Sequence, residues 1–239
     1  DENVTEYLWL GGEEYPVGLP CTGTWEATNL GAQTFFDYTD VKPGDEGENT
    51  ISLHVDSNPA WACIDVSLTE NDDATCVEPE GESEGVGVCG TDGAPSFDGE
   101  LAENMKFAAW LDQGTIPGWQ GEEGDPTEGD NKWNGRDSIE VLLFSNESGP
   151  ASDVLGGKSY ALAAPNVNGG APMTPNQTNY IGLAWCAGTQ TVGASAITCD
   201  GASMGNDAQT DTMKANIAFR VEQARNNPEF RCVFPQSID

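Results

Sequence analysis

The chain has 239 residues, with nine Lys plus Arg against forty Asp plus Glu and a net charge of −31. This length allows one large β domain or two small ones. The charge argues against nucleic acid as a partner, because binding to phosphates requires a basic surface. No window approaches the ~20 apolar residues of a transmembrane helix, so no membrane span is predicted.

Three explanations of the acidity stay open. The acidic residues can keep the surface hydrated in high salt, or they can form loops that bind divalent cations. Alternatively, they repel one another, and this repulsion is screened only in the environment in which the protein works. The 29 Gly and 14 Pro are spread without a period, which indicates short strands joined by turns. A chain that begins at Asp1 without a signal peptide is expected to be a mature, processed product.

The N-terminal extension, residues 1–20, contains one apolar segment between an acidic start and Gly11-Gly12. This segment is a candidate donor strand made of Val4, Thr5, Glu6, Tyr7, Leu8, Trp9 and Leu10. It is either an edge strand of its own sheet or a strand that pairs with another subunit. Residues 21–239 are then expected to form a single domain.

Period-2 alternation predicts the strands of that domain. Residues 50–55 and 60–68 alternate on either side of a turn, and we expect them to form an antiparallel hairpin. The clearest pattern is a core strand that buries Met213, Ala215, Ile217, Phe219 and Val221. Further strands are expected at residues 24–28, 33–38, 138–144, 160–164 and 179–187, with a short helix leading into a strand over 101–111 and a helical turn capped by Ser152 at 151–155. Nine to eleven strands without a repeat fit one sandwich of two sheets.

Two acidic insertions, at about 69–100 and 112–136, interrupt the strands. Calcium takes six to eight oxygen ligands, which such loops can supply. The candidate ligands are Asp112, Glu122, Glu123, Asp125 and Asp130, and residues 71–73 come next. Neither loop matches the EF-hand pattern, so a solvated acidic loop is the simpler interpretation. We predict that the protein requires no cofactor, and calcium is the one ion that these loops suggest as a possible ligand.

The chain has seven cysteines, and their spacing favours disulfides over zinc ligation because no close-spaced Cys or His pair occurs. Cys76 with Cys89 and Cys186 with Cys199 are expected to close local loops. Cys63 is expected to pair with Cys232 or Cys21, which leaves one cysteine over. Disulfides indicate an oxidising compartment, and the sequons at Asn3, Asn146 and Asn176 suit glycosylation on an extracellular surface.

The sequence gives little support for catalysis. The one histidine, His54, is expected on the outward face of its strand, and HExxH and P-loop patterns do not occur. With forty acidic residues, carboxylate pairs carry no specific signal for a glycosidase. We therefore predict that the chain is not an enzyme.

Three segments in order resemble the TasA and camelysin-like proteins, exported biofilm-matrix fibre subunits, and their archaeal bundling-pilin relatives. They are the turn VKPGD at residues 41–45 with the strand after it, GELAENM at 99–105, and GNDAQTD at 205–211 with the strand and the EQARNNP that follow. The extra cysteines and the long insertions depart from the family.

This resemblance implies an all-β, jelly-roll-like antiparallel β-sandwich that is exported and polymerises outside the cell by donor-strand exchange. The N-terminal strand of one subunit then completes the sheet of the next, so the partners are identical subunits, with lateral bundling or other matrix components in addition. We place this role on residues 4–10, with Tyr7 and Trp9 as anchors. The alternative is a monomeric secreted module, calcium-stabilised or carbohydrate-binding, with Trp61, Trp119 and Trp133 as a stacking surface.

Overall fold

The computed structural model describes residues 36–73, 80, 99–121, 124–135, 139–144 and 148–235. The chain divides into two units, Asp1–Asp37 and Tyr38–Asp239. All helices and strands among the described residues belong to the second unit.

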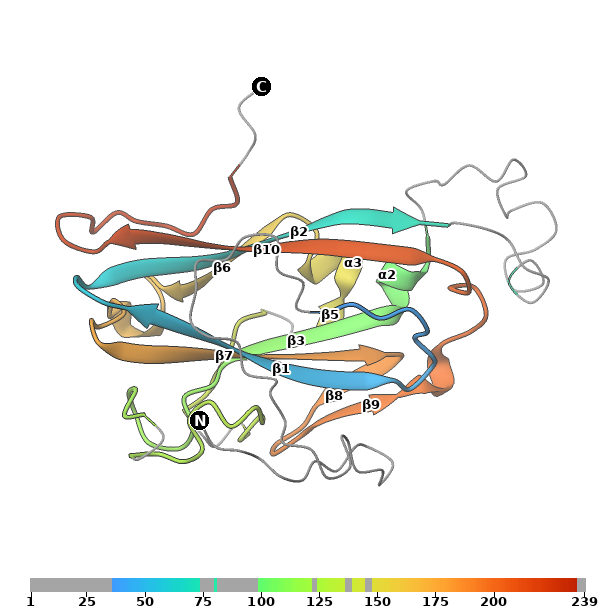
Figure 1. Ribbon diagram of the computed structural model, residues 1–239, viewed down its shortest axis with the longest axis horizontal. Helices are drawn as coiled ribbons and strands as arrows, with labels where there is room; N and C mark the ends of the chain where they lie inside the picture. Colours follow the sequence, from blue (N-terminus) through green and yellow to red (C-terminus); the bar gives the residue numbers. More distant parts are fainter. Residues whose placement is uncertain are drawn as a thin grey trace, which may run out of the picture. The chain divides into compact units, whose positions relative to one another are not determined.

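Two antiparallel sheets form a β-sandwich, which confirms the predicted all-β fold (Figure 1). The five-stranded sheet has the order β1-β7-β3-β4, with β5 also paired to β3, and the three-stranded sheet has the order β10-β2-β6. The strands are β1 (Glu46–Val55), β2 (Ala60–Asp72), β3 (Met105–Leu111), β4 (Val141–Leu142), β5 (Gly149–Pro150), β6 (Lys158–Ala163), β7 (Gln177–Ala187) and β10 (Thr212–Gln223). A hairpin of β8 (Thr189–Val192) and β9 (Ile197–Asp200) and four short helices, α2 (Leu101–Asn104), α3 (Ala151–Val154), η1 (Asn168–Gly170) and η2 (Gly201–Ser203), complete the described elements. The jelly-roll connectivity stays a prediction.

The main core lies between the sheets, because alternate residues of each strand point inward. Ile64 and Val66 of β2 are buried there, as are Ile181 and Leu183 of β7. A cavity of about 20 Å³ remains among these side chains, and Ile51 of β1 also lines it. Its apolar lining gives water no hydrogen-bonding partners, so we expect the cavity to be dry.

The predicted hairpin of residues 50–55 and 60–68 is wrong, although both strands exist. β1 pairs with β7 along its whole length, whereas β2 pairs with β10 and β6 in the other sheet. The turn between β1 and β2 therefore carries the chain from one sheet to the other. Alternation identifies a buried face but does not identify the strand that forms the hydrogen bonds.

The segment expected to be a core strand is the edge strand β10. Ile217 and Phe219 are half-buried, Ala215 is exposed, and Val221 is 53% exposed. The inward-facing side of β10 is thus only partly covered, because among the described strands β10 has a neighbour on one side only.

Other predicted elements are confirmed in part. Residues 101–111 form a short helix followed by a strand, α2 and β3. The cap at Ser152 is wrong, because Pro150 occupies the N-cap of α3 and no side chain caps the helix. Within 138–144 only Val141–Leu142 is a strand, residues 36–38 form none, and the β8-β9 hairpin was not predicted. Residues 24–28 and 33–35 lie outside the described part.

The C-terminal segment, residues 224–235, covers the outer face of the three-stranded sheet. A disulfide joins Cys63 of β2 to Cys232, and Trp61 Nε1 donates to the Asn227 carbonyl oxygen at 2.9 Å. Arg220 of β10 donates to the Val233 carbonyl oxygen at 2.9 Å and lies over the Phe230 ring. Trp61 and Cys63 are therefore buried on the side of the sheet that faces away from the main core.

A second, smaller core lies on the outer face of the five-stranded sheet. Trp110 of β3 packs there against Trp133 of the 112–136 insertion and Val192 of β8. Gly182 of β7 is required at this point, because a Cβ atom on it would lie 2.1 Å from the Trp110 ring. Trp133 of the insertion is thus packed on the sheet, whereas residues 115–118 are exposed, so the interpretation as a solvated loop holds for only part of the described insertion.

Candidate functional site

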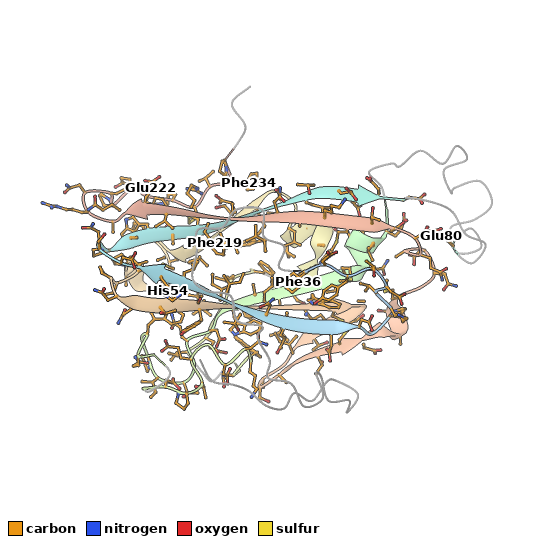
Figure 2. The ribbon with its side chains drawn as sticks, viewed as in Figure 1. Phe36, His54, Glu80, Phe219, Glu222 and Phe234 are labelled. Atoms are coloured by element: carbon orange, nitrogen blue, oxygen red, sulfur yellow. A yellow bond between two sulfur atoms is a disulfide. The ribbon has the colours of Figure 1, made fainter. Side chains whose placement is uncertain are left out.

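Among the described strands, β10 has a neighbour on one side only and forms an edge of the sandwich. It spans twelve residues and pairs with β2 along its full length. Figure 2 shows Phe219 on the side of β10 that faces the five-stranded sheet, and Glu222 on the opposite side. An edge strand of this length leaves alternate N–H and C=O groups directed away from its partner, where an additional strand can bind.

β1 forms the corresponding edge of the five-stranded sheet, and both edge strands reach the main core. Ile51 of β1 and Ile217 of β10 line the same cavity between the sheets. In Figure 1 both strands are drawn in front of the strands with which they pair. A further strand along β10 could therefore combine main-chain hydrogen bonds with apolar contacts to partly covered side chains.

A pair of acidic residues, Asp112 and Glu140, stands where the 112–136 insertion leaves and re-enters the five-stranded sheet. β3 and β4 are antiparallel, with Trp110 opposite Leu142 and Leu111 opposite Val141. Continuing this register by one residue places Asp112 opposite Glu140. We call these two residues the carboxyl stem; Asp112 is 0% exposed and Glu140 is buried.

The carboxyl stem has unusual electrostatics. Burial is the main cause that raises the pKa of Asp112 to about 6, and the charge of Asp130 adds to it. Burial likewise raises the pKa of Glu140 to about 8, with a further contribution from Asp112. Two buried carboxylates facing one another repel, so the pair favours either a shared proton or a cation.

Asp130 and Asn134 lie beside the stem. Asn134 Nδ2 is within 3.4 Å of Asp130 Oδ1 and within 3.2 Å of both Glu140 Oε1 and the Lys132 carbonyl oxygen. The Asn134 backbone N–H donates to Glu140 Oε2 at 2.6 Å, and the Asn131 N–H donates to Asp112 Oδ2 at 3.2 Å. Of the predicted calcium ligands, the structure therefore brings Asp112 and Asp130 toward one place.

Asp125, another predicted calcium ligand, has a different role. Its carboxylate accepts hydrogen bonds from the N–H groups of Thr115, Ile116 and Thr127 and from Thr127 Oγ1. These bonds, led by that from the Thr127 hydroxyl group, lower the pKa of Asp125 to about 2. Asp125 thus organises the insertion, because each of its two carboxylate oxygens accepts two hydrogen bonds within it. Glu122 and Glu123 lie outside the described residues.

A second acidic cluster lies where β2 ends and β10 begins. Oxygen atoms of Asp73, Glu80 and Asp211 lie within 4.8 Å of one another, and Glu80 is 1% exposed. Figure 2 shows Glu80 at this end of the sandwich. Asp211 also accepts the Leu101 N–H at 2.9 Å, which ties the cluster to α2. The sequence prediction at 71–73 included Asp73 but neither Glu80, which follows a few residues later, nor Asp211, which is distant in the chain.

Two of the predicted disulfides are formed, Cys63–Cys232 and Cys186–Cys199. The first resolves the alternative between Cys232 and Cys21 as the partner of Cys63. The second links β7 to β9. These bonds indicate a compartment outside the reducing cytoplasm. Cys76 and Cys89 lie outside the described residues.

The predicted stacking surface is wrong for two of its three tryptophans. Trp61 is buried under the C-terminal segment, and Trp133 is buried against Trp110, with its Nε1 donating to the Gly193 carbonyl oxygen at 3.0 Å. Trp119 is half-buried near Tyr180. A carbohydrate platform built from all three residues is therefore not present.

His54 and Asn176 are at the surface. The His54 ring lies beside the Ser52 and Thr178 hydroxyl groups, at 3.2 Å and 3.3 Å. Asn176 is exposed, so its sequon is accessible. The candidate donor strand of residues 4–10 and the sequons at Asn3 and Asn146 lie outside the described residues.

No family model matches the chain, and no curated protein matches it. Among the described residues, no helix is long and apolar enough to cross a membrane. Function is therefore inferred from the geometry and from the sequence resemblance.

Proposed function

We propose that this protein is a structural subunit of an extracellular filament, in which residues 4–10 of one subunit add as a strand to the β10 edge of the next. The observation that carries the proposal is the edge position of β10, which extends over twelve residues and has a neighbour on one side only among the described strands. The occupant is the N-terminal segment of a second copy of the chain.

The side chains of β10 support this choice of edge. Ile217 and Phe219 are half-buried, and Val221 is more than half exposed although it points toward the five-stranded sheet. An edge strand with uncovered apolar residues tends to pair with another chain unless it is protected. Alternate side chains of an added strand would cover these positions, and its main chain would bond to β10.

The N-terminal segment suits this role by its composition. Residues 4–10 are apolar except for Thr5 and Glu6, whereas acidic residues are abundant in the rest of the chain. Export through a dedicated pathway and fibre formation follow from the resemblance to the TasA and camelysin-like family.

Net charge sets a condition on assembly. Each subunit carries −31, so two approaching subunits repel unless ions screen them. At about 1 M salt the screening length falls to about 3 Å. We therefore expect filaments to form readily at high ionic strength and to form poorly in dilute buffer.

The test compares two truncations of the purified chain by electron microscopy in high salt. Deleting residues 1–10 removes the candidate strand, whereas deleting residues 1–3 is the matched control. We expect filaments from the control and from the intact chain, and monomers from the longer deletion. A synthetic peptide of residues 1–15 should bind the longer deletion in a one-to-one ratio.

Two outcomes would contradict the proposal. Filaments of unchanged repeat from the longer deletion would show that another surface drives assembly. An intact chain that stays monomeric at every salt concentration would favour the alternative of a monomeric secreted module. In that case the peptide experiment would report a strand that completes its own subunit.

A further inference from the structure

We infer that the N-terminal segment of the incoming subunit lies antiparallel to β10 and that Arg225 binds the acidic residues at the start of that segment, Asp1 and Glu2. This inference rests on the proposed function, because it assigns a direction and a charged contact to the added strand.

The N-terminal segment is acidic on both sides of its apolar residues. Residues 1–15 contain five acidic residues and no basic residue. Asp1 and Glu2 precede residues 4–10, and Glu13 and Glu14 follow them. A strand with these flanks is attracted to a basic surface and repelled by an acidic one.

β10 and the residues after it form a basic region in an acidic chain. Residues 212–231 contain only two acidic residues but four of the chain's nine basic residues, which are Lys214, Arg220, Arg225 and Arg231. β1, which is the edge strand of the other sheet among the described strands, contains Glu46 and Glu48 and no Lys or Arg. Charge therefore favours β10 over β1 as the edge that receives an acidic segment.

Arg225 is the basic residue of this region that forms no ion pair with a described residue, and it is exposed. The other three basic residues each form an ion pair, Lys214 with Glu70, Arg220 with Asp65 and Arg231 with Glu229. Arg225 follows β10 by two residues, at the end of the strand that Glu222 marks in Figure 2. Its guanidinium group is therefore available to a carboxylate of another subunit.

Aligning the two apolar stretches shows which acidic residues reach Arg225. The inward apolar positions 217, 219 and 221 of β10 are centred on Phe219, and residues 4–10 are centred on Tyr7. If Tyr7 lies opposite Phe219, an antiparallel strand places Asp1 opposite Arg225, with Glu2 next to it. A parallel strand with the same centre places Glu13 opposite Arg225 instead.

The existing sheet favours the antiparallel direction. β10 is antiparallel to β2, and β2 is antiparallel to β6. Purely antiparallel sheets are over-represented in proteins, and an antiparallel pair is slightly more stable per residue than a parallel pair. We therefore assign Arg225 to Asp1 and Glu2 rather than to Glu13 and Glu14.

Charge reversal on the intact chain tests this assignment. The measurement is the critical concentration for filament assembly, at the lowest salt concentration at which the unmodified chain assembles. Arg225→Glu should raise the critical concentration about fivefold, because a carboxylate then faces the acidic start of the segment. Adding Glu2→Arg should bring it back to within about twofold of the unmodified chain, because the ion pair re-forms with its charges exchanged.

Two controls separate this contact from the effect of net charge. Arg225→Glu with Glu13→Arg has the same net charge as the rescued variant, but its critical concentration should stay close to that of Arg225→Glu alone. Lys42→Glu changes the net charge as much as Arg225→Glu does, at an exposed position before β1, and should raise the critical concentration less than about twofold. At about 1 M salt the screening length is about 3 Å, so all these variants should assemble alike.

The direction of the strand is decided by the two rescue variants. If Glu13→Arg restores assembly and Glu2→Arg does not, the added strand is parallel and the inference is wrong. If neither restores assembly, although urea unfolding shows that Arg225→Glu is as stable as the unmodified chain, Arg225 does not bind these residues and the inference is again wrong.

The remaining outcomes distinguish this inference from the filament proposal. If Arg225→Glu assembles as Lys42→Glu does, Arg225 makes no contact with the segment, and the filament proposal still stands as long as deletion of residues 1–10 abolishes assembly. Filaments from that deletion, or an intact chain that never assembles, would overturn both.

Discussion

The two sheets cover their outer faces by different means. On the three-stranded sheet the C-terminal segment is attached covalently, through Cys63–Cys232, and Arg220 adds polar contacts. On the five-stranded sheet the 112–136 insertion is held by tryptophan packing and by buried carboxylates. A covalent attachment does not depend on pH or ions, whereas carboxylates do. The two faces should therefore respond to different perturbations.

Removing the long disulfide should have the largest effect. The Cys63–Cys232 bond joins residues 169 apart, whereas Cys186–Cys199 joins residues 13 apart. If loop-closure entropy dominates, replacing both Cys63 and Cys232 by Ala should lower the free energy of unfolding by about 5 kcal/mol. Replacing both Cys186 and Cys199 by Ala should lower it by about 3 kcal/mol. Urea unfolding of both variants measures the difference. Equal losses would show that loop length does not govern these bonds.

Gly182→Ala should be the next most damaging change, and it acts on the other face. The new Cβ would lie 2.1 Å from the buried Trp110 ring, which packs against Trp133. Overpacking of this kind costs about 3 kcal/mol. The unfolding temperature of the Gly182→Ala variant should rise in part toward that of the unmodified chain when Trp110→Phe is added, because the smaller ring makes room for the new Cβ atom. Additive losses in the double variant would refute a clash with Trp110.

Arg220→Met should destabilise the covalently attached face by about 3 kcal/mol, because it leaves the buried Asp65 without its charge partner. Arg220 Nε lies 3.0 Å from Asp65 Oδ2, and the same carboxylate accepts from Ser159 Oγ. Lys214→Met, at the exposed pair with Glu70, is the control and should cost less than about 1 kcal/mol. Urea unfolding that finds the two variants equally stable would contradict the role of Asp65.

Sequence patterns were sufficient to find the longer strands and insufficient to pair them. Alternation located β1, β2 and β10, but β1 bonds to β7, which begins more than 120 residues later in the chain. The alternation of β2 places Trp61 and Cys63 on the outward face of the sheet. Both residues are nevertheless buried, because the C-terminal segment covers them. No local pattern carries that information.

The candidate calcium ligands show the same limit. Asp112 and Asp130 were identifiable because they lie in an acidic loop, and Asp125 was selected on the same ground although its hydrogen bonds make it structural. Glu140 was missed because its place opposite Asp112 follows from the register of β3 and β4. Glu80 likewise joins Asp211 only through the fold.

The smallest effect concerns acid, and it should appear on the carboxylate-held face. The pKa of Asp125 is lowered to about 2, from an ordinary value of 3.8, chiefly by its bond from the Thr127 hydroxyl group. A lowered pKa means that the folded state favours the charged form. The stability that Asp125 contributes is therefore complete above about pH 4 and is lost as the pH falls toward 2.

Asp125→Asn isolates this contribution. The two carboxylate oxygens accept four hydrogen bonds, and the amide nitrogen that replaces one of these oxygens cannot accept any. We expect this variant to be about 2 kcal/mol less stable than the unmodified chain at pH 6. The gap should narrow toward pH 2, where the unmodified carboxyl group takes up a proton. Asp153→Asn, an exposed position, should show no such convergence. Urea unfolding of both variants from pH 6 to pH 2 measures these differences. If the difference in free energy of unfolding between Asp125→Asn and the unmodified chain stays constant with pH, the loop depends on the shape of Asp125 rather than on its charge.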